Sequence, residues 1–199
     1  MAKVVANMSM SLDGFIADPN DGIEHLFGWY GGGDVAVPTA DPQITFRTSE
    51  ASAADLRELF AGVGALVCGR RLFDLTGGWG GNHPTGAPIF VVTHAVPEGW
   101  PQDGVPVEFV TDGLENAISR AKEAAGEKVV AVASANVAQQ CLDAGLLDEI
   151  RVDLVPVLLG EGIPFFANFA GAPIELEDPR VTEGAGVTHL HYRVKPASG

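Results

Sequence analysis

The stretch Gly64-Ala65-Leu66-Val67-Cys68-Gly69-Arg70-Arg71-Leu72-Phe73 contains the most informative change of pattern in this 199-residue sequence. An apolar run ends at Gly69, and two arginines follow at an expected helix start. A strand that leads directly into a helix presents free backbone N–H groups and the positive end of the helix dipole. The guanidinium fork of arginine matches the geometry of a phosphate. We therefore predict a site for a phosphorylated ligand or cofactor here, with solvated helix-start arginines as the alternative.

Length and composition favour one ordered globular domain over residues 1–199, with 46% hydrophobic and 19% charged residues. The net charge of −14 argues against broad nucleic-acid binding, which needs a basic surface. Cys68 and Cys141 occur in apolar patterns, and we expect buried free thiols in a reducing compartment. The N-terminal segment is a poor signal peptide, and no apolar run approaches the roughly 18 residues of a membrane span. These features predict a cytoplasmic protein without a membrane partner.

Strand and helix patterns alternate along most of the chain, which predicts an α/β fold with a mostly parallel sheet. A glycine-rich turn near the C-terminus predicts a final antiparallel edge hairpin. Residues 23–47 show no clear period, and we expect a short helix followed by a mobile, irregular segment. The expected strands are 3–10 with a continuation over 12–17, then 65–68, 88–93, 105–110, 128–133, 149–159, 174–183 and 187–195. The expected helices are 49–63, 70–75, 114–125 and 136–144.

Two further strand ends carry candidate binding residues. Small residues at Ala133-Ser134-Ala135 let a ligand approach the backbone closely, although they also suit ordinary packing of a helix on a sheet. Together with the Gly69 junction, this turn resembles the second end of a dinucleotide site at the carboxyl edge of a sheet. Thr93 and His94 end another strand and are candidates to contact a ribose or phosphate, with a loop histidine as the equal alternative.

Other chemistries have weaker support. His189 and His191 share one face of the last strand, but no carboxylate or cysteine cluster accompanies them in the sequence. We therefore expect solvent-facing histidines and no metal site. A serine hydrolase is disfavoured because the GxSxG motif is absent, and an ordinary Rossmann dehydrogenase because GxGxxG is absent.

Five motifs, in their order along the chain, point to a family. They are Ser11-Leu12-Asp13-Gly14-Phe15-Ile16-Ala17, Cys68-Gly69-Arg70-Arg71-Leu72-Phe73, Phe90-Val91-Val92-Thr93-His94, Gly145-Leu146-Leu147-Asp148-Glu149-Ile150 and Val155-Pro156-Val157-Leu158-Leu159-Gly160-Glu161-Gly162. The chain resembles, over residues 3–195, the dihydrofolate-reductase-like proteins that share the reductase domain of the bifunctional riboflavin-biosynthesis deaminase–reductase. This resemblance implies a three-layer dihydrofolate-reductase-like fold, an NADPH-dependent reductase and a homodimer.

The resemblance also implies roles for individual residues. The phosphates on the adenosine side of NADPH would contact Gly69, Arg70, Arg71 and Leu72, and the adenine ribose would lie near Thr93 and His94. The pyrophosphate would lie at Ala133, Ser134, Ala135, Asn136 and Val137. The loop over the nicotinamide would include Asp13, Gly14, Phe15 and Ile16. The substrate pocket would be walled by residues 156–166 and by aromatic side chains; its named candidates are Phe15, Trp29, Pro156, Leu158 and Phe166.

Two departures from the family pattern concern the cofactor. Relatives usually carry Gly-Gly where this chain has Ala133-Ser134, and Cβ atoms there narrow the approach of a pyrophosphate and disfavour unusual backbone angles. Relatives often carry an arginine where this chain has Ala95, which weakens selection of the 2′-phosphate of NADPH.

As a hypothesis, hydride passes from NADPH to a C=N or C=O group of a small heterocycle. The acceptor would be pterin-like or similar to the riboflavin precursor 5-amino-6-(5-phosphoribosylamino)uracil. Asp13 is the best-placed carboxylate to supply a proton, ahead of Glu24 and Asp34, and water is the alternative donor. The competing hypothesis is a catalytically silent nucleotide- or heterocycle-binding protein on the same fold.

Overall fold

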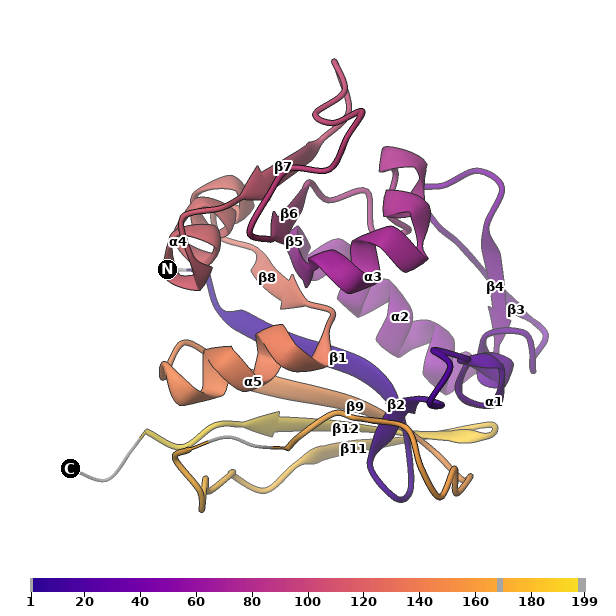
Figure 1. Ribbon diagram of the computed structural model, residues 1–199. Coiled ribbons are helices and arrows are strands. Elements are labelled where there is room, and N and C mark those ends of the chain that lie inside the picture. The colour runs from indigo at the N-terminus through magenta and orange to yellow at the C-terminus, as the bar shows by residue number, and fades with distance from the viewer. Residues whose placement is uncertain (1, 168–169, 197–199) are drawn as a thin grey trace.

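A twisted sheet forms the centre of the computed structural model, which describes residues 2–167 and 170–196 (Figure 1). In this part of the chain the sheet has eight strands in the order β11-β12-β9-β1-β8-β5-β6-β7. The six strands from β9 to β7 are parallel, and β11 and β12 form an antiparallel edge, as predicted. The parallel strands are β1 (Val4–Ser11), β5 (Val63–Gly69), β6 (Ile89–Val92), β7 (Val107–Val110), β8 (Val129–Val132) and β9 (Glu149–Val155); the edge strands are β11 (Arg180–Gly184) and β12 (Val187–Arg193).

Helices cover both faces of the sheet, which makes the three layers that the family resemblance implies. One face packs against α4 (Leu114–Ala125) and α5 (Ala135–Asp143). The other packs against α2 (Glu50–Gly62), α3 (Arg70–Leu75) and the turn η2 (Gly77–Gly81). Alternate residues of β5 serve the two cores, since Val67 belongs to the first and Cys68 to the second. Cys68 and Cys141 are both buried free thiols, as expected.

Most element boundaries agree closely with the sequence prediction. The helices at 70–75 and 114–125 have the predicted bounds. The side chain of Ser49 caps α2 by accepting a hydrogen bond from the Ser52 N–H, and Gly145 follows α5 with φ +65°. The strand predicted over 149–159 ends earlier, at Val155, and the strand predicted over 174–183 begins only at Arg180. No helix in residues 2–167 or 170–196 is long and apolar enough to cross a membrane.

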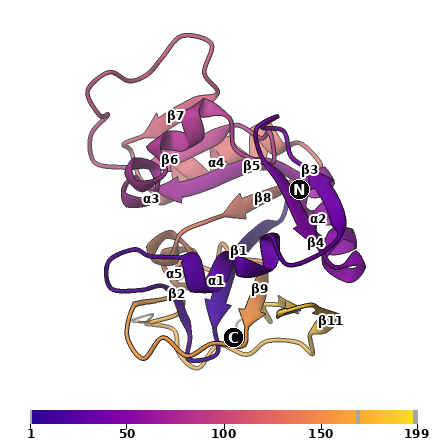
Figure 2. The same cartoon turned by 90° about the vertical axis from the view of Figure 1, so that its right-hand side faces the viewer.

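The prediction of an irregular segment within residues 23–47 is wrong. After the short helices α1 (Glu24–Phe27) and η1 (Gly28–Tyr30), the chain forms a hairpin of β3 (Val35–Pro38) and β4 (Thr45–Thr48). Figure 2 shows this hairpin beside α2. Val37 is buried against Leu26 and Trp29, so the hairpin covers a third apolar core. The strands have only four residues each, too few to display a period in the sequence.

The predicted continuation of the first strand over 12–17 also differs in the structure. The chain turns at Gly14, whose φ of +93° favours glycine. After the turn, β2 (Phe15–Ala17) leaves the main sheet and pairs with β10 (Ile163–Pro164).

A buried polar layer separates α2 from strands β9 and β12, and it corrects the prediction of solvent-facing histidines. His189 is fully buried. Its Nδ1 donates to Asp153 Oδ1 over 2.7 Å, because an ionised carboxylate only accepts, and its Nε2 lies 2.9 Å from Ser52 Oγ. His191 is largely buried as well, and its Nε2 lies 3.1 Å from Asp55 Oδ1. The two histidines do share one face, but α2 covers that face.

Removing the carboxylate of Asp153 should destabilise the protein strongly. The Asp153→Ala change leaves a buried imidazole without its acceptor, and an unsatisfied buried polar group costs about 1–3 kcal/mol. Urea unfolding measures this loss, with Asp178→Ala at an exposed carboxylate as the control that should change stability by less than about 0.5 kcal/mol. A loss below about 1 kcal/mol for Asp153→Ala would contradict the importance of this layer.

Asp55 should make the free energy of unfolding depend on pH in the acidic range. Burial by itself raises the pKa of Asp55, but the hydrogen bond and charge of His191 and the charges of His189 and Arg151 outweigh it and lower the pKa below its ordinary value. A carboxyl with a lower pKa in the folded state stabilises the fold above its unfolded pKa of about 3.9 and loses this contribution as pH falls through the folded pKa. The stability difference between wild type and Asp55→Asn should therefore shrink as the pH falls below about 4. Urea unfolding across this range tests it, and a difference that grows on acidification would refute it.

Candidate active site

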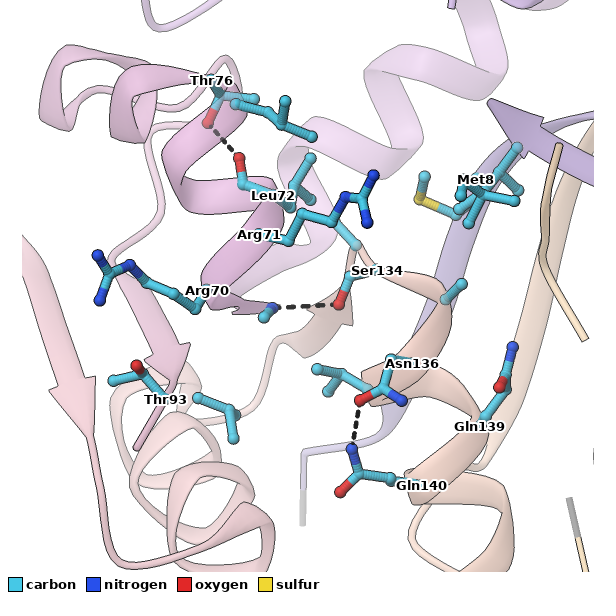
Figure 3. A pocket seen from close by; sticks show the side chains of 18 of the residues that line it. Met8, Arg70, Arg71, Leu72, Thr76, Thr93, Ser134, Asn136, Gln139 and Gln140 are labelled. Atoms are coloured by element: carbon cyan, nitrogen blue, oxygen red, sulfur yellow. Dashed lines mark hydrogen bonds between the residues drawn. The ribbon is translucent and has the colours of Figure 1, made fainter. Parts of the chain in front are cut away.

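A large cavity lies where helices leave neighbouring strands on opposite faces of the sheet. The strand β8 ends at Val132 opposite Ala6, while β1 continues to Ser11 alongside β9. From the adjacent ends of β5 and β8, α3 and α5 turn to opposite sides of the sheet. Such a switch point opens a crevice at the carboxyl ends of the strands, where ligands bind in open α/β sheets. The cavity between α3 and α5 has a volume of about 1120 Å³ (Figure 3).

The structure brings together most of the cofactor residues predicted from the sequence. Both strand–helix junctions and the end of β6 contribute to the wall, although they lie far apart along the chain. The predicted residues that line the cavity are Ile16, Gly69, Arg70, Arg71, Leu72, Thr93, His94, Ala133, Ser134, Ala135, Asn136 and Val137.

Ser134 joins the two junctions directly. Its hydroxyl accepts a hydrogen bond of 3.1 Å from the backbone N–H of Gly69 (Figure 3). Ser134 has an extended backbone with φ −156° and ψ 142°, a conformation that any L-residue adopts. The Ser134 side chain therefore requires no strained backbone, and its hydrogen bond joins the ends of β5 and β8.

Three helices begin at the cavity without a side-chain cap. The residues before α3 and α4 are Gly69 and Gly113, which have no side chain that could cap a helix, and the Ser134 side chain before α5 makes no capping hydrogen bond. All three residues line the cavity. Ser49, by contrast, caps α2 away from the cavity. First-turn N–H groups without an internal partner carry partial positive charge, so the three helix starts together favour an anionic ligand.

Both arginines at the cavity are paired with carboxylates. Arg70 Nε lies 2.8 and 2.9 Å from the two oxygens of Asp74 on its own helix, and Arg70 Nη1 donates to the Ala95 carbonyl. Arg71 forms a two-pronged contact with Asp21, which lies on the loop between β2 and α1. In Figure 3 the two side chains point in different directions, Arg70 to the left, away from Ser134, and Arg71 to the right, on the side of Met8.

The remaining predicted residues do not line the cavity. The carboxylate of Asp13 accepts hydrogen bonds from the Ser11 hydroxyl and from the N–H groups of Leu159 and Gly160. These hydrogen bonds lower the pKa of Asp13 and stabilise its charged form, which opposes proton donation. Trp29 is buried in the third core and donates to Ser9 Oγ. The others outside the lining are Gly14 in its turn, Phe15 on β2, the exposed Pro156 and Leu158, and the half-buried Phe166.

Sequence reasoning missed several cavity residues. Asp21 was hidden in a segment that the sequence marks only as a turn. Gln139 and Gln140 lie one turn after Asn136 on α5, and an extension of the binding motif by three and four positions would have found them. Ile163 and Pro164 also line the cavity; they fall within the predicted wall 156–166 but were not among its named candidates. Met8 faces the cavity because β1 extends beyond the end of β8.

The buried polar layer is a separate cluster and offers no second active site. Ser52, His189 and Asp153 form a chain of hydrogen bonds in the order found in serine hydrolases, but Ser52 is only 1% exposed, so no substrate reaches it. Asp55, Asp153 and His189 bring possible metal ligands within 4.8 Å of one another. However, His189 Nδ1 already donates to Asp153, and the Arg180 guanidinium lies 3.7 Å from Asp55. The cluster therefore forms an internal ion-pair network.

Solved structures with the same architecture define the fold class. A candidate riboflavin biosynthesis protein from Shewanella sp. PV-4 aligns with a TM-score of 0.71 and 24% identity over 98% of this chain and 100% of that protein. Dihydrofolate reductase from Enterococcus faecalis, solved with NADP(H) and RAB-propyl, aligns with a TM-score of 0.58 and 16% identity, covering 98% and 97% of the chains. The diaminohydroxyphosphoribosylaminopyrimidine deaminase/5-amino-6-(5-phosphoribosylamino)uracil reductase of Thermotoga maritima aligns with a TM-score of 0.61 and 14% identity. The alignment covers 98% of this chain and 57% of that one. The fold is dihydrofolate-reductase-like.

Family membership follows from the sequence itself. Residues 2–185 match the RibD C-terminal domain, and the chain belongs to that family. A more distant likeness is to the uncharacterized protein YyaP of Bacillus subtilis (strain 168), with 23% identity over 177 residues, which covers 83% of this chain and 81% of that protein. The family and its structural neighbours define a reductase-type fold.

Loss of the Ser134 hydroxyl should loosen the junction between β5 and α3. The Ser134→Ala change leaves the Gly69 N–H without its acceptor, and we expect a loss of about 1 kcal/mol of unfolding free energy. Hydrogen exchange should show faster exchange of the Gly69 amide. Unchanged exchange at Gly69 would mean that the hydrogen bond does not hold the two junctions together.

Proposed function

We propose that this protein is an NADPH-dependent reductase that binds its cofactor in the cavity between α3 and α5. The observation that carries the proposal is the convergence of three uncapped helix starts on one cavity in a chain with a net charge of −14. Helix N-termini favour an anionic ligand, and their convergence on one cavity of an acidic protein supports binding of an anion there. The cavity volume of about 1120 Å³ suits a dinucleotide together with a small second ligand.

Different residues of the cavity would contact different parts of the cofactor. The first-turn N–H groups of α5 and the Arg71 guanidinium would hold the pyrophosphate, and Ser134 would keep the two junctions at a fixed separation. Thr93 and His94 would lie along the adenosine half. When bound, the cofactor supplies a hydride, and the role of the protein is to orient the two reactants and exclude water from between them.

The hydride acceptor would be a small flat heterocycle, similar to a pterin or to 5-amino-6-(5-phosphoribosylamino)uracil. Support comes from the apolar end of the cavity, where Met8, Ile16 and Ile163 offer aliphatic surface to a ring. Support also comes from the reductases of known substrate among the structural neighbours. A proton must follow the hydride, and Asp13 accepts three hydrogen bonds outside the cavity. We therefore assign the proton to solvent water.

The alternative is a binding protein that holds the nucleotide without hydride transfer. One observation favours it: Asp21 is the only carboxylate in the described cavity wall, and it is already paired with Arg71. Such a protein binds NADPH and does not oxidise it in the presence of any acceptor.

The Arg71→Met change tests the cofactor site. Loss of a charged hydrogen-bond donor to a phosphate should weaken NADPH binding by about tenfold or more in isothermal titration calorimetry. Arg193→Met removes the same charge from an exposed position on β12 and should leave the affinity unchanged. Absence of NADPH binding to the wild-type protein at millimolar concentration would overturn the proposal. Binding without loss of NADPH absorbance over a panel of pterins and ribosylaminopyrimidines would favour the silent binding protein.

A further inference from the structure

We propose that Asp21 is a built-in competitor for the phosphate-binding arginine of the cavity. Its carboxylate occupies Arg71 in the free protein, and a phosphate group of the ligand displaces it. The inference rests on the proposed function for the identity of that ligand, and it adds a regulatory contact to the same site.

The geometry of the pair is that of a bound oxyanion. Arg71 Nε lies 3.1 Å from Asp21 Oδ1, and Nη2 lies 2.7 Å from Oδ2. A guanidinium binds carboxylate and phosphate oxygens alike through a parallel pair of N–H donors, so a phosphate that takes the Nε–Nη2 edge of Arg71 must displace Asp21. Both residues line the cavity although they are 50 positions apart in the sequence. The carboxylate therefore occupies the donors that a ligand phosphate would use.

The loop that carries Asp21 is held in a turn by its own hydrogen bonds. Asp18 Oδ1 accepts hydrogen bonds from the N–H groups of Asn20 and Gly22, and the Asp18 N–H donates to the Gly22 carbonyl. Asp21 itself has φ +66°, a left-handed conformation that aspartate and asparagine tolerate better than most residues. The loop connects β2 to α1 and lies on the same side of the molecule as α3 (Figure 2). These hydrogen bonds close the turn, and within it the Asp21 carboxylate contacts Arg71.

Only one of the two arginines can couple ligand binding to a movement of the wall. Arg70 is paired with Asp74 on the same helix, so an exchange of its partner moves no other element. The partner of Arg71 belongs to a separate loop whose neighbours Ile16, Ala17 and Ile23 also line the cavity. The Arg71 side chain is 68% exposed and that of Asp21 20%, so the pair is open to solvent on the arginine side, where a multiply charged phosphate can compete for the guanidinium. Ligand entry thus releases the loop, and loss of the ligand restores the pair.

The test measures binding of NADPH and, separately, of inorganic pyrophosphate by isothermal titration calorimetry at fixed ionic strength. Asp21→Asn removes the competing charge and keeps a residue that accepts the left-handed backbone. We expect it to bind both ligands about two- to fivefold more tightly than wild type. Asp103→Asn removes the same charge from an exposed position between β6 and β7 and should change neither affinity. In the Arg71→Gln background, Asp21→Asn should bring no gain.

The outcomes separate this inference from the proposed function. If Asp21→Asn binds neither ligand more tightly, or gains as much in the Arg71→Gln background as alone, the competitor role is overturned. If Asp21→Asn binds pyrophosphate more tightly while no variant binds NADPH, the competitor role stands and the NADPH-dependent reductase is refuted. If NADPH binds equally to wild type and Asp21→Asn, and pyrophosphate does too, the cofactor site stands without the competitor.

Discussion

The opposite departure of α3 and α5 from two adjacent parallel strands is the constraint on which the rest of this structure depends. Because β5 and β8 are neighbours, the two helix starts must lie close together at one edge of the sheet. Because the helices then pack on different faces, a cavity opens between them, and side chains of both helices line it. The hydrogen bond from the Gly69 N–H to the Ser134 hydroxyl joins the two helix starts beside this cavity. The cavity is thus a consequence of topology, and its chemistry comes from the residues at the turns.

The cavity between α3 and α5 gathers positively charged and partially positive groups, although the molecule as a whole is acidic. The chain carries −14, yet the cavity collects three uncapped helix starts and two arginines. The structure neutralises the arginines with carboxylates, one on the same helix and one on a separate loop. The two arginines of the cavity are thus paired with carboxylates of the same chain. In our proposal, a ligand that replaces Asp21 at Arg71 releases the loop that carries Asp21, and this loop forms part of the cavity wall.

The pattern of residues along the chain could predict those elements that have long apolar runs or that end at glycines. The helix at 114–125 is bounded by glycines and has a buried face of regular period, so its bounds follow from the sequence. The apolar run predicted as a strand over 65–68 is a strand, but it extends over Val63–Gly69. The hairpin at 35–48 has strands too short to show a period. His189 was misjudged because strand alternation shows only that it shares a face with His191. Whether α2 covers that face is decided by packing between residues more than 130 positions apart.

The sequence by itself determined the family, the alternation of strands and helices, and the residue types at the strand ends, because these depend on motifs and on short-range periodicity. Only the tertiary structure decided what those residues face. It paired Arg71 with Asp21 across 50 positions, joined Gly69 to Ser134, withdrew Trp29 into the core and tied Asp13 into a loop. The physical reason is that the partner of a charged or polar group is set by strand order and helix placement, which local sequence does not encode.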